Sequence, residues 1–489
     1  KLGFIKYDIL GIRHLDTLME CDRLAHGEED PKRLYQLPEE TMALPEIWEQ
    51  VNSGDSTGIF QIETTSFKSL LPDFKAKNER DIADLIAVNR PGVTRSGQLD
   101  VYMKRRMGEE EIKTPHPLMS EVLASTFGVA VYQEQVMKLF QVLAGYSLVE
   151  ADGIRKIMGK MLFEKMLEEK PKFIERCVKN PKFLEGCVGD PVKVANECWK
   201  MLEKAGIYVF NSAHSQAYAM ISTWGAYEKH FFPREYLTAL MRTDPGRANL
   251  YVKEARRTGI PILPPDVNES DERFTLTKSG IRWGLGDIKS VGASAVKEIL
   301  KYRPYESLDD YLSKTSGRGG RKKTVVENLI KIGAFDSLNP NRSELLRYFY
   351  EKNKIDSLVP DLSDENVIFD VEMELAGNYI TQDPLEKYLD ILDAMALKTP
   401  REMNELKVGE VARIGGMISS LRTHQARNGE MAFIEVTYNE EVFPATVFSN
   451  KWVPNKILYQ VGRPVLLEIK RLDRGVMVQE VLRLDYLQD

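Results

Sequence analysis

Apolar residues recur every three or four positions through much of the first half of the chain. Between residues 38 and 245 they form long stripes, such as VMKLFQVLAGY and HSQAYAMISTWGAYEKHFF. This spacing gathers apolar side chains on one face of an α-helix. Glycine and proline, which end or interrupt helices, divide the stripes at Pro91-Gly92, Gly108, Pro115 and Pro117. We therefore predict a helical domain over 38–245, preceded by a strand-like segment and a helix over 1–37.

The helical pattern stops near residue 260. The segment IPILPPDVN over 260–268 contains three prolines and has no helical period, which marks a boundary. After it, IRWGLGDIKSVGASAVKEIL (281–300) predicts a helix, a tight glycine turn and a second helix, and TVVENLIKIGAFDSL (324–338) predicts a further helical unit. The RGGRKK segment between them predicts a flexible basic loop. We place one domain at 246–353 and an acid-rich, weakly periodic linker at 354–400.

From about residue 408 the apolar period changes to two. Five short stretches alternate apolar and polar residues: VARIGGMI, MAFIEVTY, EVFPATVF, PVLLEIKRL and GVMVQEVLRL. Alternation of this kind is typical of strands with one buried face. Five strands within about 80 residues match the size and strand count of an OB barrel. The fold class that we predict is multidomain α+β, with a five-stranded OB-type barrel at 401–489.

The composition indicates the class of protein to which these domains belong. The chain has 489 residues, enough for three or four domains, and its 43% hydrophobic and 29% charged content is ordinary for a soluble protein. The sequence lacks an apolar run of about 18 residues, so we expect no membrane span. Four cysteines without C-x-x-C spacing predict neither a zinc site nor disulfides, and favour a cytoplasmic location. A net charge of −6 argues against a basic surface overall but is compatible with local basic grooves. Because residue 1 is lysine, we expect the chain to be cut from a larger protein.

Eight motifs occur in a fixed order. They are KLGFIKYDILGIRHLDTL at the start, TGIFQIET (57–64), NRPGV (89–93), TFGVAVYQEQVM (126–137), GYSLVEADGIRKIMGKM (145–161), NSAHSQAYAMIS (211–222), PPDVNES (264–270) and IKIGAFD (330–336). In order and spacing they resemble the alpha subunits of bacterial replicative DNA polymerases, the C-family polymerases. The resemblance covers nearly the whole chain. It implies the end of a palm domain at 1–37, helical fingers at 38–245, a helix–hairpin–helix DNA-binding domain at 246–353 and an OB domain at 401–489.

The resemblance implies DNA-templated DNA synthesis, in which dNTPs are added to a primer 3′ hydroxyl with the help of two Mg²⁺ ions. It makes Asp8 the third palm carboxylate, and thus a catalytic residue and a metal ligand. Lys6 lies two residues earlier on the same strand face, within reach of a triphosphate, although a solvated edge lysine is the alternative. The family's Pro-Asp-x-Asp-x-Asp motif does not occur in the sequence. Because one carboxylate cannot hold two metal ions, we expect the chain alone to be inactive and to need the N-terminal, palm-containing part of the polymerase.

Basic residues in the motif at 145–161 predict a triphosphate site. Arg155, Lys156 and Lys160 lie around one helical turn, where three cations repel one another unless an anion joins them. The resemblance assigns Arg155 and Lys156 to the nucleotide triphosphate, and a solvated basic face is the alternative.

Further nucleotide contacts are implied for residues of three other motifs, namely Arg90, Tyr132, Gln133, His214 and Ser215. Three of these residues also have a structural interpretation. Core packing is the alternative for Tyr132, a helix cap for Arg90, and an ordinary core or surface role for His214.

Three basic groups predict contacts with primer-template DNA. The first is a basic-aromatic cluster of Tyr102, Lys104, Arg105 and Arg106. The second is the glycine turn of a hairpin, with Lys289, Val291 and Gly292, where backbone N–H groups would face a phosphate. The third is the basic loop, with Arg318, Arg321, Lys322 and Lys323. In the barrel, Phe433, Tyr438, Phe443 and Phe448 are candidates for stacking on single-stranded template DNA, and alternation places about half of them in the core.

Some residues depart from the family's motifs. Val93 replaces the second proline of Arg-Pro-Gly-Pro, Met161 the second lysine of Gly-Lys-Lys, and Ser290 the first glycine of the hairpin. The resemblance implies a sliding clamp as a partner, but the acidic segment contains no clear Gln-x-x-Leu-Phe peptide. The alternative hypothesis to a polymerase fragment is a non-catalytic DNA-binding subunit.

Overall fold

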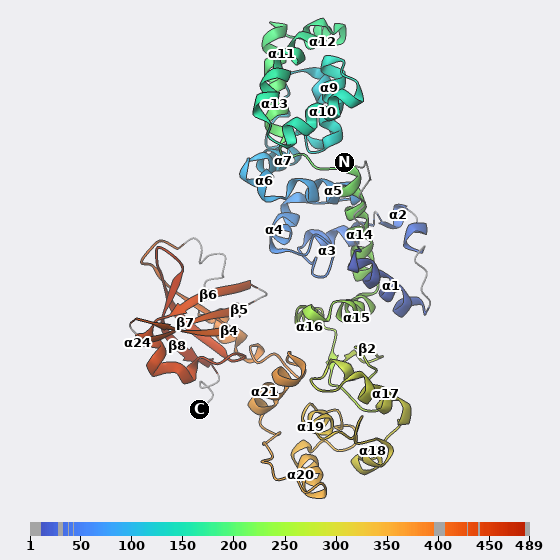
Figure 1. Ribbon diagram of the computed structural model, residues 1–489, viewed down its shortest axis with the longest axis vertical. Helices are drawn as coiled ribbons and strands as arrows, with labels where there is room; N and C mark the ends of the chain where they lie inside the picture. The colour runs from blue at the N-terminus through green and yellow to red at the C-terminus, as the bar shows by residue number, and fades with distance from the viewer. Residues whose placement is uncertain are drawn as a thin grey trace, which may run out of the picture. The chain divides into compact units, whose positions relative to one another are not determined.

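The computed structural model describes residues 11–27, 33–37, 39–42, 44–395, 406–427, 429–438 and 441–484. The chain divides into two compact units, Lys1–Thr243 and Asp244–Asp489, which we call the N-terminal and C-terminal units (Figure 1). None of the helices in these segments is long and apolar enough to cross a membrane.

The N-terminal unit is helical, as predicted. Its helices are α1 (Arg13–His26), α2 (Glu39–Met42), α3 (Pro45–Asn52), α4 (Thr65–Phe74), α5 (Glu79–Val88), α6 (Pro91–Arg95), α7 (Gln98–Arg106), α8 (Pro117–Leu123), α9 (Gln133–Ala144), α10 (Leu148–Gly159), α11 (Phe163–Lys179), α12 (Pro181–Gly186), α13 (Pro191–Gly206), α14 (Ser212–Phe231) and α15 (Pro233–Thr243). Pro91 and Pro117 occupy the first position of α6 and α8, where a missing N–H costs least.

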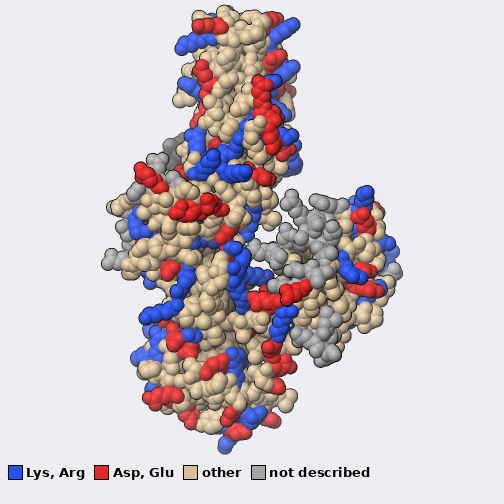
Figure 2. Space-filling model, turned by 180° about the vertical axis from the view of Figure 1, so that it is seen from behind, with Lys and Arg blue, Asp and Glu red and all other residues tan. Residues whose placement is uncertain are grey.

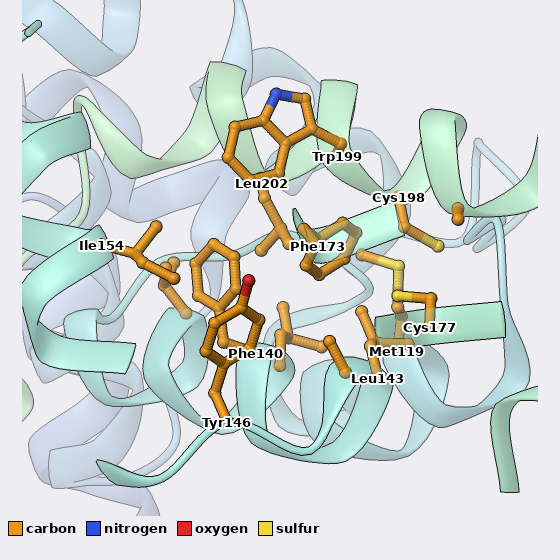
Figure 3. Packing of buried hydrophobic residues seen from close by; sticks show 14 of the residues in the cluster. Met119, Phe140, Leu143, Tyr146, Ile154, Phe173, Cys177, Cys198, Trp199 and Leu202 are labelled. Carbon is orange, nitrogen blue, oxygen red and sulfur yellow. The ribbon is translucent and has the colours of Figure 1, made fainter. Parts of the chain in front are cut away.

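The helices from α8 to α13 share an apolar core of their own. Phe140 of α9, Phe173 of α11 and Trp199 of α13 pack together at its centre, with ring centroids 5.4–6.2 Å apart (Figure 3). Cys177 and Cys198 are buried in the same core, and burial raises the pKa of the Cys198 thiol to about 12. All four cysteines of the chain are free thiols.

The first part of the C-terminal unit combines helices with a small sheet. The helices are α16 (Ala248–Arg257), α17 (Ala293–Tyr302), α18 (Leu308–Lys314), α19 (Lys323–Lys331) and α20 (Arg342–Lys352). The sheet consists of β1 (Ile262–Leu263), β2 (Thr275–Leu276) and β3 (Ile281–Arg282), in the order β1-β3-β2.

The helix predicted at the start of 281–300 is wrong. This stretch forms β3 and a short 3₁₀ turn, η4 (Leu285–Asp287), before α17 begins. Ile281, Trp283 and Leu285 are all buried, which is a period of two rather than of a helix. Gly284 lies so close to the backbone of Arg273 that a Cβ atom there would come within 2.6 Å of it.

The predicted linker contains folded structure. Within it lie α21 (Glu365–Ala376), a 3₁₀ turn η5 (Glu386–Tyr388) and α22 (Leu389–Ala394). Phe369, Tyr379, Leu385 and Tyr388 form a core cluster with residues of the barrel. Because these apolar residues are sparse among acidic ones, their burial depends on tertiary packing that the local pattern does not reveal.

The C-terminal stretch forms a closed five-stranded barrel, as predicted. The strands are β4 (Val411–Ala426), β5 (Gly429–Tyr438), β6 (Glu441–Val447), β7 (Pro464–Arg471) and β8 (Val476–Arg483), and the helix α24 (Ser449–Asn455) lies between β6 and β7 in the chain. The strand order around the barrel is β4-β5-β6-β8-β7. Ile414, Ile434, Val447, Leu467 and Val478 are buried in its core because alternate residues of each strand point inward.

Candidate nucleotide and nucleic-acid interface

The buried carboxylate of Asp84 joins three helices of the N-terminal unit. Asp84 belongs to α5 and is only 2% exposed. Tyr132, the N-cap of α9, donates from its hydroxyl to Asp84 Oδ1 at 2.5 Å, and Tyr102 of α7 donates to Oδ2 at 2.9 Å. Burial raises the pKa of Asp84, although both hydroxyl groups act in the opposite direction. Both tyrosines are therefore core residues, and the sequence-based placement of Tyr102 in a DNA-contacting cluster is wrong.

Tyr132 also connects two of the predicted nucleotide motifs. It forms a parallel bridge with Phe210, which immediately precedes the 211–222 motif. The backbone N–H of Phe210 donates to Val131 O at 2.9 Å, and the N–H of Gln133 donates to Phe210 O at 2.8 Å. Gln133 is half-buried at the first position of α9. The motifs at 126–137 and 211–222 therefore lie side by side.

The first turn of α14 is fixed at two further points. Glu134 of α9 accepts hydrogen bonds from Ser212 N at 3.0 Å and from the Asn211 side chain at 3.2 Å. An acidic group at this helix N-terminus also interacts favourably with the helix dipole. Ser215 is buried, and its hydroxyl donates to Ala83 O of α5 at 2.6 Å. Of the pair predicted to contact nucleotide, Ser215 thus faces the protein interior while His214 is exposed.

A row of aromatic rings follows one face of α14. His214 lies between Phe210, at a centroid distance of 5.5 Å, and Tyr218, at 4.1 Å. The spacing of four residues places His214 and Tyr218 on the same face of α14, and Phe210 contacts His214 from the segment just before the helix. The row continues to Phe60, stacked 5.1 Å from Tyr218, and to His14, stacked 5.5 Å from Phe60. We call Phe210, His214, Tyr218, Phe60 and His14 the aromatic row.

Arg90 is held by the protein at one end of this row. It is the N-cap of α6, and its guanidinium donates to Ala87 O at 2.7 Å and to Tyr208 O. The guanidinium also lies 4.6 Å from the centroid of the Phe210 ring, and burial lowers its pKa. The guanidinium is thus held by a carbonyl in the last turn of α5 and lies against the Phe210 ring, whereas its side chain makes no hydrogen bond that caps α6.

The basic turn of α10 has an anion of its own, which the sequence interpretation overlooked. Asp152 Oδ1 accepts from Arg155 Nη2 at 2.8 Å, and Asp152 Oδ2 pairs with Lys156 Nζ at 2.6 Å. Hydrogen bonds from Lys156 and Arg155 lower the pKa of Asp152. The Lys156 side chain is nevertheless 60% exposed, and Lys160, the C-cap, is exposed as well. Since exposed ion pairs are weak, an incoming anion can exchange with Asp152.

The cations at the end of α7 are bound differently. Arg106 donates to Asp81 Oδ1 at 2.7 Å and to two backbone carbonyls, and its guanidinium lies 4.2 Å from the Phe74 ring centroid. Arg105 donates to a neighbouring glutamate at 2.9 Å. Lys104 is exposed. Of the three predicted DNA contacts, Lys104 alone presents an exposed side chain, while Arg105 and Arg106 have structural partners.

The predicted hairpin turn lies between η4 and α17. Val291 is buried, Gly292 is the N-cap of α17, and Ser290 adopts a positive φ of 69°, where the family's glycine would be unstrained. The N–H of Lys289 donates to a carbonyl of α21 at 2.7 Å, and its Nζ lies 3.1 Å from Glu374 Oε1. The hairpin is therefore braced by α21.

The basic loop, predicted to be flexible, is attached to α17 at two backbone positions. Glu298 of α17 accepts backbone hydrogen bonds from Ser316 at 3.0 Å and from Gly320 at 2.6 Å. Although burial acts in the opposite direction, these amides lower the pKa of Glu298. The loop presents four exposed cations, Arg318, Arg321, Lys322 and Lys323. On the face in Figure 2, basic and acidic side chains are interspersed, so basic character is local.

Of the aromatic residues predicted to contact DNA in the barrel, some lie in the interior and others on the surface. Phe433 is 43% exposed and Phe448 is 38% exposed, whereas Phe443 is buried and Tyr438 packs on the cluster around Phe369. Phe433 lies opposite Arg422 on the neighbouring strand, which is also exposed. This combination of an aromatic ring and a cation is typical of single-strand binding.

Lys6 and Asp8 lie outside the described residues. Among the residues that the structure describes, no group of three histidine, cysteine, aspartate or glutamate side chains could hold a metal ion.

Sequence reasoning overlooked three acidic residues that organise these sites. Asp84 could have been found as a single acid within the apolar run IADLIAV, since such a residue needs a partner when buried. Asp152 precedes Arg155 and Lys156 by three and four residues, the spacing of helical ion pairs. The contact of Glu134 with Ser212 joins distant segments and left no local signal.

Two family descriptions match the chain. Residues 19–181 match the bacterial DNA polymerase III alpha subunit finger domain, and residues 259–345 match the helix-hairpin-helix motif. Together with the closed barrel, they account for the fingers, hairpin and OB-type elements of the predicted fold class.

Curated relatives match over nearly the whole chain. The DNA polymerase III subunit alpha of Aquifex aeolicus is 34% identical over 96% of this chain and 41% of its own length. The subunits of Thermus aquaticus and Bacillus subtilis are 31% and 30% identical over 99% and 92% of this chain, and over 42% of each relative. The chain thus spans about two fifths of the length of these relatives. On these matches, the chain belongs to the family of bacterial DNA polymerase III alpha subunits.

Proposed function

We propose that this chain supplies the fingers and the DNA-holding modules of a DNA-templated DNA polymerase, which transfers nucleotides from dNTPs to a primer 3′ hydroxyl. In this proposal the palm domain ends within residues 1–37, and residues 38–245 form the fingers. Residues 246–353 hold duplex DNA, residues 354–400 link them to the barrel, and residues 401–489 form the OB domain. The partners are primer-template DNA, single-stranded template DNA, dNTP and the palm-containing N-terminal part. The setting is cytoplasmic.

One observation carries the proposal. Two motifs that are separate in the sequence meet at the Tyr132–Phe210 bridge, and they leave His214 exposed within an aromatic row. A planar base can stack against exposed rings of this kind. His214 and Tyr218 are therefore our candidates for contact with the nucleotide.

Lys156 and Lys160 are our candidates for the triphosphate. Both are exposed, and Lys156 has an exchangeable partner in Asp152. A triphosphate carries more negative charge than one carboxylate and forms stronger charge-assisted hydrogen bonds. Arg155, whose side chain is only 17% exposed, would also bind the triphosphate by exchanging its partner Asp152 for a phosphate oxygen.

We propose Mg²⁺ as the metal of this reaction, with this chain supplying only part of the site. Its motifs supply one catalytic carboxylate, Asp8, and two-metal catalysis needs ligands for both ions. We therefore propose Asp8 as one ligand, with Lys6 near the triphosphate.

Duplex DNA is assigned to the hairpin and the basic loop. The N-terminus of α17 and the four loop cations Arg318, Arg321, Lys322 and Lys323 are suited to phosphates. Single-stranded template is assigned to the barrel through Phe433 and Phe448. A sliding clamp has no clear docking peptide in the acidic segment, so no residue is assigned to it.

Primer extension tests the proposal. Purified residues 1–489 should bind primer-template DNA without extending it, and addition of the palm-containing part should restore extension. Robust extension by the chain alone would overturn the assignment of the missing carboxylates. Binding without extension, even with the palm-containing part present, would instead favour a non-catalytic DNA-binding subunit.

A further inference from the structure

The position of Asp84 is unfavourable for stability alone. Every residue of α5 from Ile82 to Val88 is buried, and Asp84 is the one ionisable side chain among them. Moving a carboxylate out of water is costly, and an apolar residue of similar volume is often the more stable choice. Its two oxygens are held instead by the hydroxyls of Tyr132 and Tyr102, at 2.5 and 2.9 Å. Buried, perturbed carboxylates of this kind occur preferentially at functional sites.

The contacts of α5 lead directly to the exposed face of α14. Through Tyr132, Asp84 fixes the bridge to Phe210, where the aromatic row begins. The residue beside Asp84, Ala83, accepts the hydroxyl of Ser215 at 2.6 Å. His214 therefore lies between two anchor points, one on each side of it in the sequence, that both return to the same turn of α5.

We propose that Asp84 is a positioning residue that acts through Tyr132 to orient His214 and Tyr218 toward the nucleotide, without contacting the nucleotide itself. This inference rests on the proposed nucleotide contact of the aromatic row. If the row binds a base, its orientation depends on the bridge at Phe210, and the bridge depends on where the Tyr132 ring is held.

The chain contains a matched control. Tyr102 donates to the same carboxylate and is equally buried, but it belongs to α7, which carries none of the side chains assigned to the nucleotide. Tyr102→Phe and Tyr132→Phe each remove one buried hydroxyl and leave one oxygen of Asp84 without its donor. A purely structural role predicts equal effects from the two changes.

The test uses an alpha subunit that contains this chain together with the palm, with dNTP as the varied substrate. Thermal unfolding should show similar losses for Tyr132→Phe and Tyr102→Phe. We expect Tyr132→Phe to raise the KM for dNTP about five- to tenfold, the equivalent of one hydrogen bond, and Tyr102→Phe to change it less than about twofold. The Kd for primer-template DNA should stay unchanged in both. The double variant Asp84→Asn with Tyr132→Phe should raise the KM little more than Tyr132→Phe alone. Both substitutions disrupt the same hydrogen bond between Asp84 and Tyr132.

His214→Ala separates this inference from the function on which it rests. If His214→Ala raises the KM for dNTP but the two tyrosine variants have equal effects, Asp84 is merely structural and the inference is overturned. If His214→Ala leaves the KM unchanged, the proposed nucleotide contact fails and the inference fails with it. An increase for His214→Ala and Tyr132→Phe, but not for Tyr102→Phe, supports both.

Discussion

Two basic clusters of the N-terminal unit look alike in the sequence but differ in the structure. On α7, Arg106 is surrounded by fixed acceptors, including Asp81 and two backbone carbonyls. On α10, Lys156 pairs with the half-buried Asp152 and remains largely in solvent. Local charge density is similar in both places. A cation whose donors are used by the backbone supports the fold, whereas one with an exchangeable partner is available to a ligand.

The largest effect that we expect, and the strongest test of this comparison, comes from replacing Arg106. Arg106→Ala should destabilise the protein by about 3 kcal/mol, because it leaves Asp81 and the carbonyls near Phe74 with unmet hydrogen bonds. Denaturant unfolding measures the loss. Lys104→Ala on the same helix should change the free energy of unfolding by less than about 0.5 kcal/mol, since Lys104 is exposed. Equal effects would show that Arg106 is no more structural than its neighbour.

The second test concerns α10. Changing Arg155 and Lys156 together to Ala should reduce kcat/KM for dNTP in a complete polymerase on the order of a hundredfold, since two charge-assisted hydrogen bonds are lost. Binding of primer-template DNA, measured separately at fixed salt, should change little.

A matched control for α10 lies on α11. Lys172 and Lys179 are exposed and pair with Glu169 and Glu175 at 2.8 and 2.5 Å, so changing both to Ala removes the same charge from a similar setting. We expect less than about a threefold change in kcat/KM. Weaker DNA binding with an unchanged KM would move the α10 cations from the nucleotide to the template.

The barrel extends the same contrast to aromatic residues. Phe433→Ala should weaken binding of single-stranded DNA by about 1–2 kcal/mol because an exposed ring is lost from a stacking surface. Phe443→Ala should instead reduce stability, since Phe443 is buried. Fluorescence anisotropy with single-stranded and duplex DNA, together with thermal unfolding, distinguishes the two. Loss of duplex binding by Phe433→Ala to the same degree would argue against a single-strand role.

The smallest effect is expected at the hairpin. Ser290 adopts a left-handed conformation that favours glycine, so Ser290→Gly should stabilise the folded protein by up to about 1 kcal/mol. The greater freedom of glycine in the unfolded chain offsets part of this gain. Duplex binding should be retained. A destabilised variant would mean that the serine side chain contributes contacts that outweigh the backbone strain.

The sequence alone was sufficient to predict most of the secondary-structure types and to identify most of the motifs that resemble the family. Helical stripes predicted the N-terminal unit and strand alternation predicted the barrel, because these periods reflect which face of an element is buried. The stretch after residue 281 was assigned to the wrong element type, and the predicted linker contains helices. The close approach of Gly284 to a neighbouring backbone and the burial of Phe369 become known only when the chain is folded.

Tertiary structure decided which candidate residues are available to a ligand. Ser215 and Tyr132 turn inward and His214 turns outward because of contacts with α5, which precedes α14 by more than 100 residues in the chain. Likewise, folding brings Asp81 and two backbone carbonyls to Arg106, whereas Lys156 keeps only its local partner Asp152 and lies largely in solvent. The hydrophobic period and the local charge depend on residues that are close in the sequence, so they can be predicted from it. Hydrogen-bond partners distant in sequence come together only when the chain is folded.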